Sequence, residues 1–116
     1  MNGKPVYSAI TYKLTGFTTL ISLELRQCGD GGDYALDLVL AKGMAGSSDS
    51  VRMHCEAVSQ FEVKGFGGGL TQLLYLVVED VSDRQWDRVR FRVRDAEDDK
   101  MSFYCNAVVV SDAVRV

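Results

Sequence analysis

The strongest structural signal in the chain is the stretch WDRVRFRVRDAEDDKMSFYCNAVVV, residues 86–110. Its first part alternates apolar Val89, Phe91 and Val93 with arginines at every second position from 88 to 94. Successive side chains of a strand point to opposite faces, so the apolar residues share one face and the arginines share the other. A polar segment, 95–100, then leads into a second apolar run. The stretch predicts a β-hairpin at the centre of the fold.

The register of this hairpin follows from its core face. A slip of one residue would move the arginines into the core and Phe91 into water. The segment between the strands holds no Gly or Pro, which favours a loop of three to five residues over a two-residue turn. The predicted core positions of the return strand are Met101, Phe103, Cys105, Ala107 and Val109.

Length and composition indicate one folded domain that spans residues 1–116. Hydrophobic residues make up 47% of the chain and charged residues 25%, which is typical of globular proteins. The formal net charge is −3 and the sequence pI is near 5.0. A mildly acidic chain is a poor general binder of polyanions, so nucleic acid is not the expected partner, although one local basic patch is compatible with this charge.

The three cysteines, Cys28, Cys55 and Cys105, lack C-x-x-C spacing, so we expect free thiols and neither a disulfide framework nor a zinc site. Cys55 and Cys105 fall on predicted core faces. The sequence begins without the apolar run of a signal peptide and contains no stretch of roughly 18 apolar residues that could span a membrane. We therefore expect a cytoplasmic protein with no membrane association.

Strand patterns recur along the rest of the chain, separated by segments rich in Gly, Asp and Ser. Residues 17–26 and 34–41 should form a second hairpin around the turn 28–33, and residues 51–63 form one bent strand or two short ones. Residues 42–50 have the composition of a surface loop, and 82–85 have the spacing of a capping box that could start one helical turn. The remaining predicted strands are 6–14 and 70–78. The fold class is all-β, an antiparallel sandwich or half-open barrel of about seven strands.

No residue cluster has the types and spacing of a catalytic, cofactor or metal centre. The run Gly65-Phe66-Gly67-Gly68-Gly69 lacks the following helix that a phosphate-binding loop needs, so a tight turn or bulge is the simpler interpretation. His54, the single histidine, is expected on a polar strand face. The acidic residues 95–99 lack the ligand pattern of an EF-hand. We predict no enzyme activity, no metal and no cofactor; the alternative is a hydrolase whose site is assembled from distant carboxylates such as Asp37, Glu56 and Glu79.

The arginine-bearing strand face is the most informative predicted surface. Guanidinium groups two residues apart on a strand stand roughly 7 Å apart, and each needs an acidic neighbour or an acidic partner. One interpretation is a cross-strand charge ladder with Glu56, Glu62 or Glu79. The other is a binding surface, for which the candidate residues are Arg88, Arg90, Arg92, Arg94 and Tyr104.

Three segments of the C-terminal half carry a family resemblance. They are CEAVSQFEVKGFGGG at 55–69, VEDVSDRQW at 78–86 and MSFYC at 101–105. They resemble small uncharacterised bacterial all-β proteins, which look similar in turn to some immunity proteins of polymorphic toxin systems. None of the three segments is a motif with known chemistry.

The resemblance implies a non-catalytic protein-binding domain that neutralises a partner toxin, and the sequence places the arginine-bearing face as its candidate surface. The alternative is an anion or single-stranded nucleic-acid binder that uses the same arginines, with Tyr104 as a stacking platform. The sequence identifies neither the partner nor the oligomeric state.

Overall fold

The computed structural model describes residues 6–7, 11, 14–28, 33–42, 50–64, 71–72, 76–82, 89–96 and 100–112. Its elements are nine strands, all paired antiparallel in one sheet. Their bounds are β1 Val6–Tyr7, β2 Phe17–Cys28, β3 Asp33–Lys42, β4 Ser50–Val63, β5 Thr71–Gln72, β6 Leu76–Asp80, β7 Phe91–Asp95, β8 Met101–Cys105 and β9 Ala107–Asp112. The predicted all-β class is confirmed, and the sheet is not closed into a barrel. Within the described part of the chain, no helix is long and apolar enough to cross a membrane.

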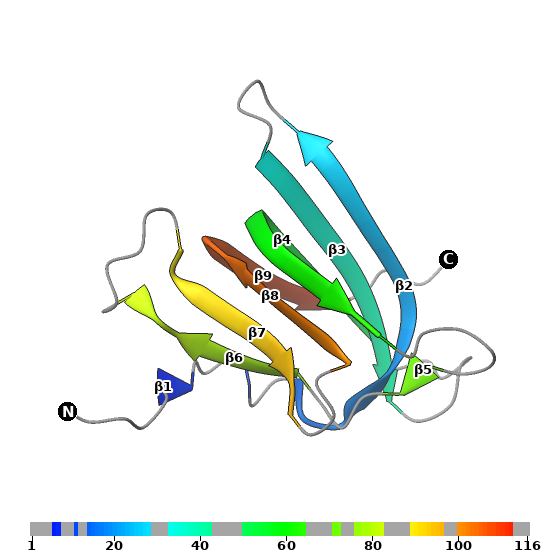
Figure 1. The fold of residues 1–116 in the computed structure, drawn as a ribbon. Helices are drawn as coiled ribbons and strands as arrows, with labels where there is room; N and C mark the ends of the chain where they lie inside the picture. The colour runs from blue at the N-terminus through cyan, green and yellow to red at the C-terminus, as the bar shows by residue number, and fades with distance from the viewer. Residues whose placement is uncertain are drawn as a thin grey trace.

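The strand order is β1-β6-β7-β8-β4-β3-β2-β5, with β9 also paired to β4. Strand β4 belongs to both halves of this sheet, because its first part pairs with β3 and β9 and its last part pairs with β8. We call β2, β3, β5, β9 and the first part of β4 the β2–β3 half. We call β1, β6, β7, β8 and the end of β4 the β7–β8 half. Figure 1 shows the two halves diverging, with the β2–β3 hairpin extending beyond the other strands.

The bend in β4 lies at two residues with left-handed backbone conformation, Ala57 (φ 57°) and Gln60 (φ 52°). The pairing of β4 with β8 also shifts register between Ser59 and Glu62. Bulges of this kind bend a strand and increase its twist. The predicted strand 51–63 is thus a single bent strand, which changes direction where its pairing passes from β9 to β8.

The hydrophobic core fills the space between the two halves. All of the following core side chains are fully buried. The β2–β3 half contributes Leu36, Leu38, Leu40, Met53 and Cys55. The β7–β8 half contributes Leu76, Val78, Val93, Met101, Phe103 and Cys105. Phe103 is the largest of these buried side chains, and its ring centroid lies 6.0 Å from that of Phe61 on β4. The core depends on apolar residues from both halves.

The central hairpin is confirmed over most of its length. β7 pairs with β8 in the register Val93↔Phe103, and residues 96–100 separate the two strands, as the predicted loop length requires. The prediction for Ala107 and Val109 was wrong, however. Val109 is 58% exposed, whereas Val108 and Val110 pack against the core.

The physical reason is a break at Asn106, between β8 and β9. The Asn106 N–H donates to the Glu56 carbonyl oxygen at 2.9 Å, directly beside Ala57 in the bend of β4. Because the return strand turns together with β4, its alternation reverses by one residue at this point. Odd positions face the core before Asn106 and even positions face it afterwards.

Two other predicted strands were also wrong in part. The strand predicted at 6–14 ends at Tyr7, and Thr11 and Leu14 have helical conformation. The Thr11 hydroxyl accepts from the Val78 N–H at 2.8 Å and donates to the Val78 carbonyl at 3.1 Å, which attaches this segment to β6. The strand predicted at 70–78 consists of two strands, β5 beside β2 and β6 beside β7.

The β2–β3 hairpin is confirmed. Several predicted segments lie outside the described residues: the turn at 29–32, the loop at 43–49, the glycine run 65–69, the helical turn beyond Ser82 and the hairpin tip 97–99.

The left-handed conformation at Ala57 leads to the first testable prediction. A Cβ atom disfavours this conformation by roughly 1 kcal/mol, and glycine adopts it freely. We expect Ala57→Gly to raise the free energy of unfolding, measured by urea denaturation, by about 0.5 kcal/mol or to leave it unchanged. The control is Ala35→Gly in the buried part of β3, which should lower it. A loss at Ala57 as large as that at Ala35 would contradict the assigned bend.

Candidate functional site

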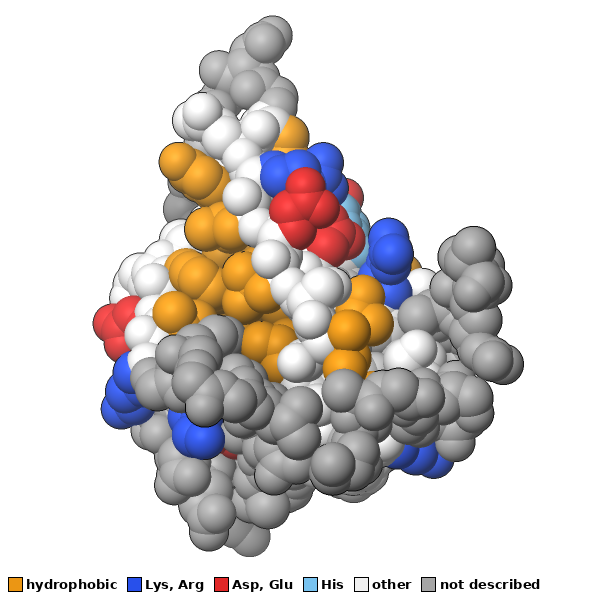
Figure 2. Space-filling model, turned by 90° about the vertical axis from the view of Figure 1, so that its right-hand side faces the viewer, with side chains coloured by type: hydrophobic (Ala, Val, Ile, Leu, Met, Phe, Trp, Pro, Cys, Tyr) orange, Lys and Arg blue, Asp and Glu red, His pale blue; other side chains and the backbone are white. Residues whose placement is uncertain are grey.

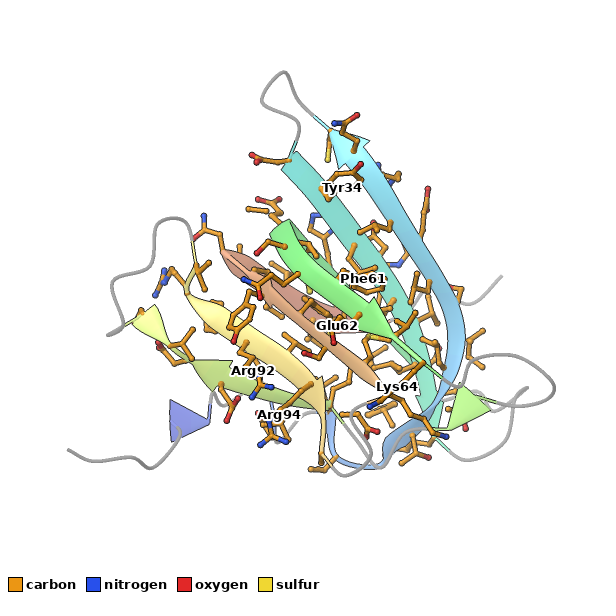
Figure 3. The ribbon with its side chains drawn as sticks, viewed as in Figure 1. Tyr34, Phe61, Glu62, Lys64, Arg92 and Arg94 are labelled. Atoms are coloured by element: carbon orange, nitrogen blue, oxygen red, sulfur yellow. The ribbon has the colours of Figure 1, made fainter. Side chains whose placement is uncertain are left out.

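The predicted arginine surface lies on the β7–β8 half, opposite the core. We define the arginine face as Arg90, Arg92, Arg94 and Tyr104; Arg88 lies outside the described residues. Arg92 and Arg94 alternate with buried Val93 along β7, and Tyr104 on the neighbouring strand β8 stands opposite Arg92. Figure 3 shows Arg92 and Arg94 side by side on β7.

A single carboxylate binds two of these arginines. Oε1 of Glu79 lies 3.4 Å from Nη1 of Arg92 and 3.4 Å from Nε of Arg94. Glu79 stands opposite Arg92 on the neighbouring strand β6, and its side chain is only 8% exposed, against 33% for Arg92 and 21% for Arg94. The cross-strand ladder considered from the sequence is therefore formed, and of the three acids considered for it Glu79 is the one bonded to these two arginines.

Arg90 differs from its two neighbours. It is exposed, and its guanidinium carbon lies 5.5 Å from the centroid of the Phe91 ring. A guanidinium over an aromatic face is attracted by the negative charge density of the ring. Arg90 is thus exposed and contacts an aromatic ring, whereas Arg92 and Arg94 are paired with Glu79.

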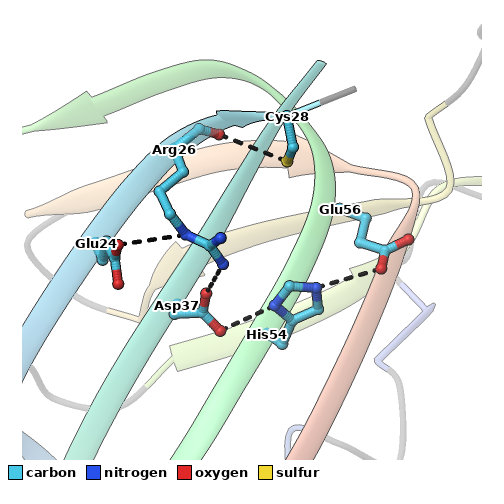
Figure 4. Close-up of polar contacts among 6 residues, drawn as sticks. All are labelled: Glu24, Arg26, Cys28, Asp37, His54 and Glu56. Atoms are coloured by element: carbon cyan, nitrogen blue, oxygen red, sulfur yellow. Dashed lines mark hydrogen bonds and ion pairs between the residues drawn. The ribbon is translucent and has the colours of Figure 1, made fainter. Parts of the chain in front are cut away.

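A second polar cluster, which sequence reasoning did not identify, spans three strands of the β2–β3 half. We call it the histidine network, and Figure 4 shows its bonds. Asp37 on β3 accepts from Nη2 of Arg26 at 2.8 Å and contacts Nδ1 of His54 at 2.9 Å. Its outer members are Glu24, 3.3 Å from Nε of Arg26, and Glu56, 3.2 Å from Nε2 of His54.

The register of the strands creates this network. Asp37 stands opposite both Glu24 on β2 and His54 on β4. Alternation alone placed His54 on a polar face, and this expectation is confirmed by its bonds to two acids. The missing information was the pairing of β3 with β4, because only that pairing brings Asp37 beside His54.

Hydrogen bonds in the network shift two pKa values in opposite directions. Burial of Asp37 opposes its ionisation, but hydrogen bonds from Arg26 and His54 outweigh this effect and lower the pKa of Asp37. The bond to Asp37 raises the pKa of His54 above 6.5; burial opposes this rise, and the bond to Glu56 adds to it. The charged forms of both groups are therefore favoured in the folded protein.

The network has the bonding of a structural cluster. Both ring nitrogens of His54 are bonded to carboxylates, so neither is placed to activate a nucleophile. Of the acids considered for a hydrolase, Asp37 has a lowered pKa and Glu79 lies in the other half of the sheet bonded to arginines. Among the described residues, no group of His, Cys, Asp and Glu could hold a metal ion.

Two hollows lie near the end of β2 and the start of β3. One, of about 370 Å³, is open and polar and includes Arg26, Cys28, His54 and Glu56 in its lining. The other, of about 270 Å³, is an apolar groove where β4 diverges from β3, lined by Leu25, Tyr34, Val58, Ser59, Gln60 and Phe61.

The cysteines are free thiols, as expected. Cys55 and Cys105 are buried and hydrogen-bond to one another, which together with burial raises the pKa of Cys55 well above its usual value. Cys28 is exposed at the end of β2.

His54 leads to a prediction on pH. Because its folded-state pKa is raised, its contribution to stability is complete below its unfolded-state pKa and is lost as the pH rises through the folded-state value. We expect the wild-type chain to lose stability between about pH 6 and pH 8.5. In His54→Gln, which removes the only histidine, the change over this range should be smaller. Urea unfolding at both pH values measures it, and an identical pH dependence in the two proteins would contradict the bonding described.

Glu79 leads to a prediction on stability. Glu79→Gln removes the charge that compensates Arg92 and Arg94 in a poorly solvated position, so the free energy of unfolding should fall by about 1–3 kcal/mol. The matched control is Glu62→Gln on the same half of the sheet. Glu62 is exposed, and its substitution should change stability by less than about 0.5 kcal/mol. If urea denaturation shows that Glu79→Gln lowers the free energy of unfolding as little as Glu62→Gln does, the pairing of Glu79 with the two arginines contributes nothing to stability.

Comparison with known proteins gives one result. The family model described as Immunity protein PIM8 matches residues 9–111. No curated protein and no solved structure matches the chain. The family match includes every strand from β2 to β8, together with both polar clusters and the bend in β4. The chain therefore belongs to the immunity protein PIM8 family.

Proposed function

We propose that this protein neutralises a partner toxin by binding it, without performing a reaction of its own. The observation that carries the proposal is the family match over residues 9–111. The bonding of the histidine network supports a non-catalytic role, since the imidazole is held between two carboxylates and does not face a nucleophile.

We further propose that the arginine face is the surface that contacts the toxin. Arg92 and Arg94 share one carboxylate, so this pair of cations is only half compensated by Glu79. Glu79 also holds both side chains in place, which reduces the conformational entropy lost when a partner binds. Arg90 and Tyr104 add an exposed cation and an aromatic ring, residue types that are enriched at the energetic centres of protein interfaces.

This geometry favours an acidic surface on the toxin. Aspartate or glutamate side chains of the partner could accept hydrogen bonds from the exposed parts of the Arg92 and Arg94 guanidinium groups. Complementary charge would also accelerate encounter between the two proteins.

One observation favours a second candidate, an anion or single-stranded nucleic-acid binder. Tyr104 and Arg92 are directly paired on one face, the combination that stacks a base beside a phosphate. The net charge of −3 argues against it. Binding to nucleic acid should weaken steeply from low to physiological salt because counterions are released, and a protein interface with a packed aromatic centre should weaken less.

The test begins with capture of the partner from the native host, followed by its purification and calorimetric titration. We expect Arg90→Glu and Arg92→Gln each to weaken binding about tenfold or more and to reduce protection against the toxin. The matched control is Arg52→Glu, because Arg52 is an exposed arginine on β4 in the other half of the sheet, and this variant should bind as the wild type does.

Two outcomes contradict different parts of the proposal. If the arginine variants keep wild-type affinity and protection, the arginine face is only a solvated ladder and the toxin binds elsewhere. If the wild-type chain gives no protection against a toxin that it binds, neutralisation itself is refuted.

A further inference from the structure

Strand β2 has an open edge at the far end of the sheet from the arginine face. β3 pairs with β2 along its whole length, from Phe17 to Cys28. On the other edge, β5 pairs only with Thr19 and Leu20. Within the described residues, no strand pairs with the outer edge of segment 22–28. The N–H and C=O groups of such an edge can pair with another strand.

The side chains on this open segment are partly apolar and partly charged. Leu25 is 38% exposed and lines the apolar groove together with Tyr34 and Phe61. Its neighbours Glu24 and Arg26 lie on the opposite face, where their side chains are 66% and 49% exposed. Figure 2 shows acidic and basic side chains gathered around the histidine, next to an apolar area of the same surface.

We propose that a second copy of this chain pairs with this edge, β2 against β2 and antiparallel, centred on Leu25. A two-fold axis through Leu25 places the Leu25 side chains of the two copies directly opposite one another. It also places Glu24 of each copy opposite Arg26 of the other. Opposite charges facing across two strands stabilise the pairing, and the two leucines extend the apolar groove across the junction.

Charge selects this register over its neighbours. Centring the pair on Glu24 would place two glutamates opposite one another, and centring it on Arg26 would place two arginines opposite one another; like charges in these positions are destabilising. Centring it on Leu23 would place Arg26 opposite Leu20, where β5 already occupies the edge. Among registers near the middle of the open segment, the one centred on Leu25 therefore joins opposite charges without displacing β5.

Charged residues on an edge strand usually prevent association. Here the two charges have opposite signs and lie symmetrically about Leu25, so they oppose association in shifted registers and support it in one. The paired segment, 22–28, is short, so we expect a dimer that dissociates on dilution rather than an obligate one. The arginine face lies on the other half of the sheet and remains open in this dimer.

The first test is a cross-link at the two-fold axis. In a Cys28→Ser background, Leu25→Cys brings two thiols together, and mild oxidation should give a covalent dimer on a non-reducing gel. The matched control is Ile21→Cys in the same background, on the same strand and 45% exposed before substitution. In the proposed register, position 21 of one copy and position 21 of the other are separated by eight residues along a strand, about 27 Å. The Ile21→Cys variant should therefore form no covalent dimer. Equal cross-linking at both positions would overturn the register.

The second test measures the wild-type chain by sedimentation equilibrium from micromolar to millimolar concentration. We expect a reversible monomer–dimer equilibrium. Glu24→Arg, which places like charges opposite one another, should weaken it tenfold or more, and Glu24→Gln should weaken it less. Circular dichroism checks that each variant is folded. A wild-type chain that is monomeric throughout overturns the proposal, and so does a dimer that Glu24→Arg does not weaken. Arg90→Glu should leave the equilibrium unchanged, which separates this test from that of toxin binding.

Discussion

The structure depends on the left-handed backbone at Ala57 and Gln60, which lets one strand serve two differently oriented halves of a sheet. A straight β4 would continue alongside β3 and would not reach β8. The bend turns the end of β4 toward β8, so that Leu36 and Leu38 belong to the same core as Phe103 and Val93. The cost of two unfavourable backbone conformations is small compared with the apolar surface that the core buries.

The bend also explains which features could be predicted from sequence. Alternation identified β2, β3, β7 and β8, because each of these strands alternates apolar and polar residues over most of its length, although the pairing of β2 shifts register twice before Ser22. It failed for Val109, since the break at Asn106 reverses the alternation and no residue type marks that point. It failed again at 70–78, where a nearly continuous apolar run was predicted to form one strand but contributes to two strands, β5 and β6, that pair at different places in the sheet. Alternation of apolar and polar residues describes one strand at a time. The bends in a strand and the choice of its neighbouring strands depend on the whole sheet.

The same distinction applies to the two polar clusters. The arginine face was visible in the sequence because four arginines alternate along one short segment, and Glu79 was among the acids considered for it. The histidine network was not visible, because Arg26, Asp37 and His54 come from three strands and meet only through register. A lone histidine gave no signal of its own. The family match, in contrast, needed no knowledge of register, since it reflects the order of residues along the chain.

The contact between Thr11 and Val78 has a consequence for the order of events during synthesis. The two residues are 67 positions apart, so the N-terminal segment leaves the ribosome long before its hydrogen-bonding partner on β6 exists. β6 is itself paired with β7, whose residues come later still. The β2–β3 hairpin, by contrast, is local and its strands are complete once Lys42 has emerged. Nascent chains should therefore form this hairpin early and attach Thr11 only near the end of translation, so the N-terminal segment is the part for which a chaperone or protease has the longest access.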